Sequence, residues 1–319
     1  MRVLVTGAAG LYGIHACQQL VDNKKIEGIV GVDDFSRKFK SAKPMGMLSD
    51  PEKKFSLLKK DFAELNAKAI DELNVDAVIH FAAFVSIDES MVKPEKYFEN
   101  NERKTFEFVH NLFSSSSQPF LIYASSPEVY GNPVRTPMDE LHPMRPRSIY
   151  AVTKLAAEKH CMSLFEWYSY PVNVIRNFNT FGPNQNVSAY SAVIPAFIER
   201  ALSNEPLRIT GSGEQTRDFQ YVKDAVRAYE SLVLTRGKLK GETFNIGSGK
   251  QIKIKGLAEK IIGLTGSSSR VEFAEGRKGD LAALQADYSK IKDKLGWQPK
   301  FSLEEGLKKT IEWYKTFRK

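Results

Sequence analysis

The sequence predicts an α/β fold in which a doubly wound parallel sheet is followed by a smaller C-terminal α/β lobe. Three observations support this prediction. Short apolar runs alternate with amphipathic stretches through the first half of the chain, a pattern typical of a parallel sheet covered on both faces. The first apolar run leads directly into a glycine-rich turn. Beyond about residue 178, turn residues cluster and lysine becomes frequent, which indicates a change of architecture.

The apolar runs predict strands at residues 2–6, 29–32, 77–81, 120–124 and 172–176. Helical periodicity is clearest over residues 11–22, 96–113 and 192–203. We expect residues 1–178 to form the sheet domain and residues 179–319 to form mainly the smaller lobe. Segments near residues 215–250 are expected to return to the sheet domain, because insertions after late strands commonly build a second lobe over such a sheet.

The composition is typical of a globular protein, with 319 residues, 42% hydrophobic residues and a formal net charge of +8. No apolar run approaches the roughly 20 residues needed to cross a bilayer, and the first strand begins too early for a signal peptide. We therefore expect a soluble cytoplasmic protein without a membrane partner. The lysines are scattered rather than gathered in runs, so we expect no nucleic-acid partner. Two distant cysteines and five histidines without ligand spacing predict no metal site.

A glycine-rich turn joins the first expected strand to the first expected helix. It carries Gly7, Gly10 and Gly13. Glycine lets the backbone turn tightly and approach a pyrophosphate closely, while the helix N-terminus supplies free amides and the positive end of a dipole. This glycine spacing between a strand and a helix predicts a Rossmann-type dinucleotide site.

Acidic residues after the next two apolar runs fit the same site. Asp33 lies about 20 residues beyond Gly13, where a carboxylate accepts hydrogen bonds from the adenosine ribose hydroxyls. Because a carboxylate repels a ribose phosphate, Asp33 favours NAD over NADP. Arg37 and Lys38 follow closely and leave NADP open. Asp61 is a candidate acceptor for the amino group of the adenine.

Two further segments carry candidate catalytic residues. Ser126 follows the fourth expected strand, whereas Tyr150 and Lys154 lie one helical turn apart at the start of an expected helix. A lysine ammonium beside a tyrosine favours the phenolate and lowers a phenol pKa that is normally about 10. Tyr150 is therefore a candidate general base, and Ser126 is a candidate bridge between the phenol and a substrate hydroxyl.

Further ordered motifs accompany these segments, at residues 80–83, 94–101, 176–183, 213–219, 244–247, 277–280 and 295–297. Together, over nearly the whole chain, they resemble the extended short-chain dehydrogenases/reductases, in the branch of NAD-dependent nucleotide-sugar epimerases and dehydratases. The resemblance implies that NAD is bound by Gly7, Gly10, Leu11, Tyr12, Asp33, Asp61, Phe62, Phe81, Ala82, Ala83, Asn101, Tyr150 and Lys154. It implies that a nucleotide-diphosphate sugar is bound by Ser86, Ser126, Glu128, Asn179, Arg217, Arg277 and Leu284. The two arginines would hold the diphosphate, because guanidinium matches phosphate in a bidentate fork.

The resemblance also implies a shared first step. The base removes the proton of the hydroxyl at carbon 4 of the sugar while hydride passes to NAD, and a keto sugar results. Related 4,6-dehydratases carry an Asp-Glu pair after the catalytic serine, whereas this chain carries Pro127 and Glu128. Proline cannot act as an acid, so 4,6-dehydration is not expected. Related UDP-glucuronate decarboxylases share the glutamate, which leaves decarboxylation or another dehydratase-type reaction as an alternative.

Later segments favour an epimerase. Residues 190–195 resemble epimerases of UDP-N-acetylhexosamines, and residues 277–281 resemble the UDP-galactose 4-epimerase branch. In that branch the residue aligned with Leu284 sets the size of the accepted sugar, and leucine is of intermediate size. We expect a UDP-sugar 4-epimerase that interconverts gluco and galacto forms or their N-acetyl forms. A non-catalytic NAD-binding regulator is a further alternative, although such proteins often lack the Tyr-Lys pair.

Members of this family often form homodimers through two helices of each subunit. Here these helices would be residues 96–113 and 150–166. Apolar candidates for the contact are Phe106, Val109, Leu155 and Leu164. The same side chains would also suit packing against the subunit's own sheet, so both interpretations stay open.

Overall fold

A seven-stranded parallel sheet forms the centre of the larger lobe. The computed structural model describes residues 1–36, 45, 48–186, 192–276 and 281–317. The sheet contains β1 (Arg2–Thr6), β2 (Gly28–Val32), β3 (Phe55–Leu58), β4 (Ala77–His80), β5 (Phe120–Ser125), β6 (Val172–Asn177) and β10 (Glu242–Ile246). Its order is β10-β6-β5-β4-β1-β2-β3, and every neighbouring pair is parallel. The predicted doubly wound fold is therefore confirmed. The strand order reverses between β1 and β4, where such sheets bind ligands at their carboxyl ends.

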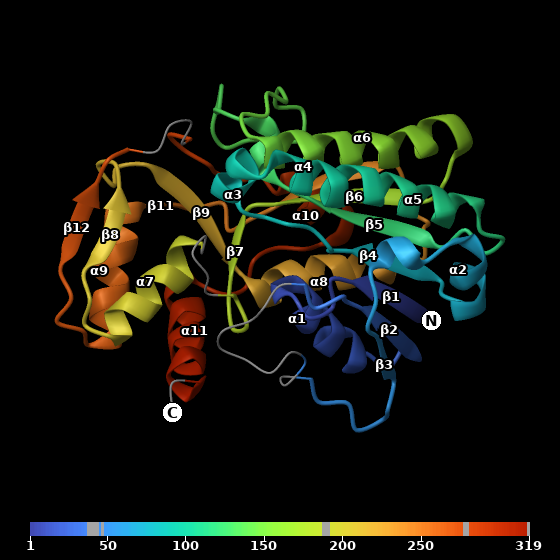
Figure 1. Ribbon diagram of the computed structural model, residues 1–319, viewed down its shortest axis with the longest axis horizontal. Coiled ribbons are helices and arrows are strands. Elements are labelled where there is room, and N and C mark those ends of the chain that lie inside the picture. The colour runs from blue at the N-terminus through green and yellow to red at the C-terminus, as the bar shows by residue number, and fades with distance from the viewer. Residues whose placement is uncertain (37–44, 46–47, 187–191, 277–280, 318–319) are drawn as a thin grey trace.

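Helices cover both faces of this sheet (Figure 1). One face packs against α2 (Ala67–Leu73), α5 (Lys104–Ser114) and α6 (Ile149–Tyr168). The other face packs against α1 (Leu11–Val21), α8 (Val222–Val233) and α10 (Ser289–Leu295). The strands themselves are almost continuously buried, as expected for a parallel sheet with helices on both sides. Among the described residues, no helix combines the length and the apolar character needed to cross a membrane.

The stretch that was expected to form one helix over residues 96–113 consists of three consecutive elements. α4 (Pro94–Tyr97) continues into a π-helical segment, η2 (Phe98–Arg103), and then into α5. A π-helical segment is rare and is frequently found at functional sites. Here it contains the buried Asn101, whose amide group bonds both backbone groups of Phe84, donating to the carbonyl at 2.8 Å and accepting from the amide at 2.9 Å. The π-helical segment is thereby tied to the loop that follows β4.

The smaller lobe contains two short sheets. β8 (Leu207–Thr210) pairs with β12 (Val271–Ala274), and β9 (Thr216–Tyr221) lies between β7 (Asn179–Phe181) and β11 (Gln251–Lys253). They pack with α7 (Val193–Leu202), α9 (Ile254–Thr265) and α11 (Leu303–Phe317) around a separate apolar core. In Figure 1 this lobe lies on the left of the larger sheet.

The chain crosses between the two lobes more than once. After β7 and β9 have entered the smaller lobe, α8 and β10 return to the larger sheet, where β10 pairs with β6 along its full length. α10 also packs beside β10, with Ile291 in the core of the larger lobe. The larger lobe is therefore built from three separated stretches of sequence.

Candidate active site

The loop between β1 and α1 is shaped by glycines that no other residue replaces without strain. Gly7 has φ +67°, and a Cβ atom there would lie 2.9 Å from the backbone nitrogen of Ala82. A Cβ atom on Gly13 would lie 2.1 Å from the carbonyl oxygen of Gly7. The loop, the start of α1 and the end of β4 are therefore packed backbone against backbone. The first turn of α1 therefore starts at the carboxyl ends of the strands. The free amides and the positive dipole end of this helix favour an anionic group there.

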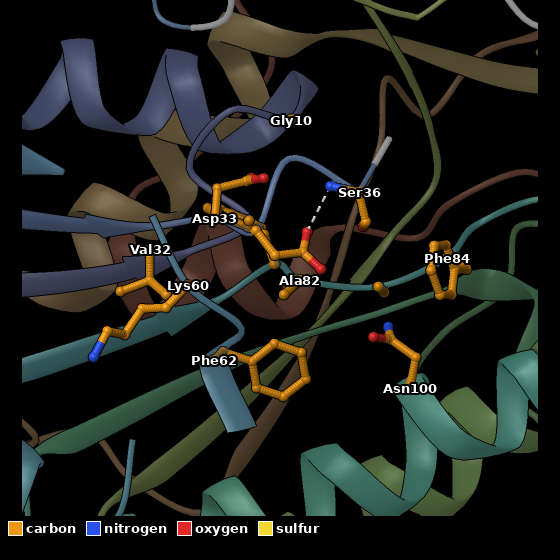
Figure 2. A pocket seen from close by; sticks show the side chains of 13 residues that line it. Gly10, Val32, Asp33, Ser36, Lys60, Phe62, Ala82, Phe84 and Asn100 are labelled. Atoms are coloured by element: carbon orange, nitrogen blue, oxygen red, sulfur yellow. Dashed lines mark hydrogen bonds between the residues drawn. The ribbon is translucent and has the colours of Figure 1, made fainter. Parts of the chain in front are cut away.

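A pocket opens beside this loop (Figure 2). It is lined by Gly7, Gly10, Val32, Asp33, Asp34, Ser36, Lys60, Phe62, Phe81, Ala82, Ala83, Phe84 and Asn100. Figure 2 shows Gly10 and Asp33 on one side of the pocket, Phe62 on another side, and Phe84 and Asn100 at one end. The structure thus brings seven of the residues expected to bind NAD into one pocket: Gly7, Gly10, Asp33, Phe62, Phe81, Ala82 and Ala83.

The carboxylate of Asp33 is held by the loop it faces. It accepts hydrogen bonds from the amide of Ala9 at 3.0 Å and from the amide of Phe35 at 2.9 Å. Burial raises the pKa of Asp33, and the two backbone hydrogen bonds oppose this change. A carboxylate fixed at the end of β2 in this way is placed to accept hydrogen bonds from a ribose.

Six residues expected to bind NAD lie outside the lining of this pocket: Tyr150 and Lys154, which are described below, and four others. Leu11 packs against the apolar core of the smaller lobe, and Tyr12 stacks on Phe81 with ring centroids 5.4 Å apart. Burial raises the pKa of Tyr12. Asn101 is occupied with the backbone of Phe84, as described above. These side chains support the walls of the pocket from behind.

Asp61, the fourth, lies between two residues that do line the pocket. Its carboxylate caps the short helix η1 (Phe62–Glu64) by accepting from the amide of Ala63 at 3.0 Å. It also contacts the ammonium of Lys104 on α5 at 2.5 Å. Asp61 therefore ties η1 to α5, and its role toward adenine stays a prediction.

The two residues of the Tyr-x-x-x-Lys motif lie in the first turns of α6. The helix begins after Ser148, whose hydroxyl accepts a hydrogen bond from the amide of Ala151. Tyr150 and Lys154 are only 8% and 4% exposed, so both are withdrawn from bulk water. The ring of Tyr150 meets that of Tyr97 edge to face at 6.5 Å, which limits its rotation. The helical spacing places both side chains on one face of α6, which packs against β5 and β6, and Lys154 contacts Tyr123 on β5.

Lys154 lies in an unusually dry environment for a lysine. Its ammonium is 4.2 Å from the centroid of the Tyr123 ring, on β5. Burial lowers the pKa of Lys154 to about 7, while Cys161 and Glu158 oppose this change. The charge of Lys154 therefore depends on the few groups that surround it.

Ser126 lies at the end of β5, where the chain enters the short helix η3 (Pro127–Tyr130). Its hydroxyl accepts a hydrogen bond from the amide of Glu128 at 3.2 Å and is 6% exposed. Pro127 occupies the first position of η3 and is buried. The turn thus holds Ser126 in a fixed place at the carboxyl edge of the sheet.

A second and larger cavity, of about 480 Å³, lies between the two lobes. It brings together Ser86, Glu128, Asn179 and Arg217, which were predicted to bind the sugar nucleotide. The Oδ1 atom of Asn179 is buried and has no hydrogen-bond partner among the described residues. A buried carbonyl oxygen without a partner is costly, which is expected where a ligand supplies the missing donor.

Of the other three residues expected to bind the substrate, Ser126 lies at the end of β5 and is not part of the cavity lining. Leu284 is fully buried in an apolar cluster with Val129, Tyr130 and Phe178, and its side chain does not line the cavity. Its influence on sugar size stays a prediction. Arg277 lies outside the described residues.

Comparison with known proteins agrees with this geometry. Residues 4–310 match the family described as GDP-mannose 4,6 dehydratase. The chain belongs to this family. Its relatives include the dTDP-D-glucose 4,6-dehydratase of Mus musculus, 34% identical over 98% of this chain and 88% of that protein. The UDP-glucose 4-epimerase of Mycolicibacterium smegmatis is 30% identical over 99% of both chains. The predicted membership of the nucleotide-sugar epimerase and dehydratase group is therefore confirmed.

Solved structures in the same group have the same fold. The UDP-glucose 4-epimerase of Thermotoga maritima, determined with UDP-glucose, superposes with a TM-score of 0.90 at 29% identity, covering 100% of both chains. The UDP-glucuronic acid 4-epimerase of Bacillus cereus, determined with UDP-glucuronic acid and NAD, superposes with a TM-score of 0.88 at 28% identity, covering 99% of both chains. The sequence relatives thus include both dehydratases and epimerases, and these two solved epimerases have high structural similarity to this chain.

Sequence reasoning missed several residues of the site. Arg147 and Arg208 line the larger cavity and add positive charge to it. A buried ion pair between Glu158 and Arg176 lies beneath the catalytic helix. The signal for Glu158 was present, because it follows Lys154 by one helical turn and a carboxylate on a buried face requires a partner.

Proposed function

We propose that this protein is an NAD-dependent nucleotide-sugar 4-epimerase that interconverts UDP-glucose and UDP-galactose, or their N-acetyl forms, through a transient 4-keto sugar. Its membership of the family makes it an enzyme of nucleotide-sugar chemistry. The choice of an epimerase is our inference. It is supported by the relatives named UDP-glucose 4-epimerase and by the residues that follow Ser126.

The cofactor is NAD, and the residues present fit it. The glycine loop leaves no room for side chains at Gly7 and Gly13, which is the cradle that a pyrophosphate requires. The fixed carboxylate of Asp33 suits two ribose hydroxyls and disfavours a ribose phosphate. When bound, NAD accepts hydride from carbon 4 of the sugar and later returns it.

The chain's own residues supply the proton chemistry and the alignment. Tyr150 takes the proton of the hydroxyl at carbon 4 and gives it back after the keto sugar has turned over. Lys154 favours the phenolate form of Tyr150, because a nearby positive charge stabilises an anion. Ser126, fixed at the end of β5, holds the reacting hydroxyl by a hydrogen bond. The low exposure of Tyr150 and Lys154 strengthens these electrostatic interactions.

The residue that carries the choice of epimerase is Pro127. It takes the position at which related 4,6-dehydratases have an aspartate, and it has no group that can release or accept a proton. Its place as the first residue of η3 leaves the backbone turn intact. The site therefore retains the groups for oxidation at carbon 4 but lacks one of the two groups for removing water from the sugar.

A product analysis tests this proposal. The purified protein is incubated separately with UDP-glucose, UDP-N-acetylglucosamine and UDP-glucuronate, and the products are assigned by NMR. We expect the galacto isomer of at least one substrate and no loss of mass. A 4-keto-6-deoxy sugar would contradict the argument from Pro127. Tyr150→Phe is the control, because it should bind NAD and form no product.

UDP-glucuronate decarboxylation is the second candidate function. The observation that favours it is Glu128, which lines the larger cavity, as an acid or base for a second step would. A UDP-pentose and carbon dioxide from UDP-glucuronate would establish this reaction and exclude the epimerase. In that case Glu128→Gln should abolish carbon dioxide release while leaving the oxidation at carbon 4.

We also propose a homodimer through α5 and α6. Val109 and Leu164 pack into the subunit's own core and do not serve such a contact. Exposed apolar side chains on these helices and on η2 include Phe98, Phe106, Val152 and Trp167. The ring of Phe106 lies 5.0 Å from that of His160, so the exposed faces of α5 and α6 adjoin. An apolar surface that spans two adjacent helices suits a second copy of the chain.

A further inference from the structure

Beneath the candidate active site lies a buried ion pair that the proposed reaction does not use. Glu158 on α6 and Arg176 on β6 are 1% and 3% exposed. The Nε atom of Arg176 donates to one carboxylate oxygen of Glu158 at 3.1 Å, and its Nη2 atom donates to the other. The carboxylate also accepts from the hydroxyl of Ser125 at 2.8 Å. Three segments of the larger lobe therefore meet at one carboxylate.

The hydrogen bonds continue from Arg176 into further segments. Its Nη1 atom donates to the hydroxyl of Tyr130 at 2.7 Å and to the carbonyl of Glu140 at 3.2 Å. The hydroxyl of Tyr130 donates in turn to the side chain of Asn245, on β10, at 2.7 Å. The network thus reaches η3 and β10 as well as α6, β5 and β6.

Three of these segments, β5, η3 and α6, supply a residue of the candidate site a few positions away. Ser125 immediately precedes Ser126, and Tyr130 lies two residues beyond Glu128. Glu158 lies one helical turn beyond Lys154 on α6. The proposed reacting side chains come from different segments, and the Glu158–Arg176 pair joins those segments to each other.

We propose that Glu158 is a positioning residue for the proton-transfer residues: with Arg176 it fixes Ser126 relative to Tyr150, and its carboxylate supplies the negative charge nearest to Lys154 on α6. This inference rests on one part of the proposed function, the oxidation of the sugar at carbon 4 by NAD. It does not depend on which product is formed afterwards. Stability alone does not explain the pair, because a buried ion pair is often replaced by apolar residues without loss of stability.

The charges around Lys154 give the inference a distinct signature. His80 of β4, Tyr123 of β5, and Tyr150 and Cys161 of α6 are the other titratable groups close to it. Burial lowers the pKa of His80 to about 3 and raises that of Tyr123 and Cys161, so these three are neutral near pH 7.

Glu158, which is paired with Arg176, therefore provides the anionic charge that Lys154 meets within this cluster. Removing it lowers the pKa of Lys154. Since the reaction needs charged Lys154, activity is then lost at a lower pH on the alkaline side.

The experiment compares variants of the full-length protein with bound NAD. Glu158→Gln leaves Arg176 without its anionic partner, so it is accompanied by the double variant Glu158→Gln/Arg176→Gln, in which two amides replace two charges. Ser125→Ala removes one hydrogen bond but retains the charge. Glu166→Gln is the matched control, because it makes the same change at an exposed position of the same helix. NAD content and thermal melting establish that each variant is folded.

Two quantities are measured: the rate at which bound NAD is reduced by a sugar nucleotide in a single turnover, and the pH profile of that rate. We expect the double variant to lose about 100-fold in rate with little change in KM, as for a small misplacement of reacting groups. The alkaline limb of the pH profile should move down by about one unit in Glu158→Gln, and by less in the double variant, which also removes the positive charge of Arg176. Ser125→Ala should lose rate without moving the limb, and Glu166→Gln should match the wild type.

A folded double variant with the rate and pH profile of the wild type would overturn the inference, and so would an equal loss in Glu166→Gln. If the double variant does not fold, the rate measured for Ser125→Ala tests the positioning of Ser126. The pH profile of Glu158→Gln then tests the effect of the carboxylate on Lys154. The proposed function fails separately, if wild-type protein reduces its NAD but releases no isomer. In that case the rate at which bound NAD is reduced still tests the role of Glu158.

Discussion

Asn179 provides a test in which function and stability should change in opposite directions. Its Oδ1 atom is buried without a partner among the described residues, and the side chain lines the larger cavity. Its backbone is held independently, because β7 pairs with β9 from Asn179 to Phe181. Replacing Asn179 with alanine therefore removes an unsatisfied acceptor without breaking the strand.

The expected magnitudes follow from these contacts. An unsatisfied buried acceptor costs about 1–3 kcal/mol, so Asn179→Ala should leave the free energy of unfolding unchanged or raise it by up to this amount. In the complex, this oxygen accepts a hydrogen bond from a donor of the sugar nucleotide, and its removal leaves that donor unpaired at a cost of about 1–3 kcal/mol. The change should weaken binding of UDP-glucose about 5-fold to 150-fold.

The assay measures both quantities in the same protein. Calorimetric titration of the NAD-loaded enzyme with UDP-glucose gives the affinity, and urea unfolding without substrate gives the stability. Asn173→Ala is the matched control, because Asn173 is fully buried with both amide atoms bonded, to Leu239 at 2.8 Å and Glu242 at 2.9 Å. It should lose stability and keep its affinity. If Asn179→Ala instead loses stability and keeps its affinity, the unpartnered oxygen does not mark a substrate contact.

Other predictions concern catalysis, pH and assembly. Tyr150→Phe should lose about 100-fold to 10,000-fold in turnover while retaining NAD, measured by product formation and cofactor content. Burial lowers the pKa of His15 to about 4, so the neutral form stabilises the fold above the unfolded pKa of about 6.5, and this contribution is lost as the pH falls toward 4. Near pH 5 the loss should be about 2 kcal/mol by urea unfolding, and it should be absent in a folded His15→Gln variant. Phe106→Glu should convert the proposed dimer into a monomer of unchanged fold in light scattering, whereas Leu141→Glu, at an exposed apolar residue on a loop, should not.

Local patterns in the sequence were enough to predict the framework of the site. The apolar runs that became β1, β2, β4, β5 and β6 are short, β-branched and bounded by turn residues, so strand was the favoured structure. The position of the glycine turn then required a phosphate cradle, because only glycine tolerates the backbone contacts found at Gly7 and Gly13. Seven of the predicted NAD residues gather in one pocket for this reason.

What the sequence did not reveal depends on contacts between distant segments. The helix period suggested a continuous helix through Asn101, but its bonds to Phe84 belong to a π-helical segment that periodicity does not detect. The sequence around Leu284 suggested that its side chain contacts the sugar. Its burial depends instead on packing with Tyr130 and Phe178, which are distant in the sequence. The sequence also did not show which faces of α5 and α6 pack inside the subunit. An apolar residue such as Val109 suits a core and a dimer contact equally well.

The return of β10 to the larger sheet has a consequence for biosynthesis. β6 pairs with β5 on one side and with β10 on the other, and β10 ends at Ile246. Until the ribosome has made α8, the apolar surface that this helix covers is exposed, and until it has made β10, one edge of β6 is open. An unpaired edge of this kind invites association with other chains. The nascent protein therefore passes through an interval, between the synthesis of β6 and that of β10, in which a chaperone or rapid translation would have most effect on its yield.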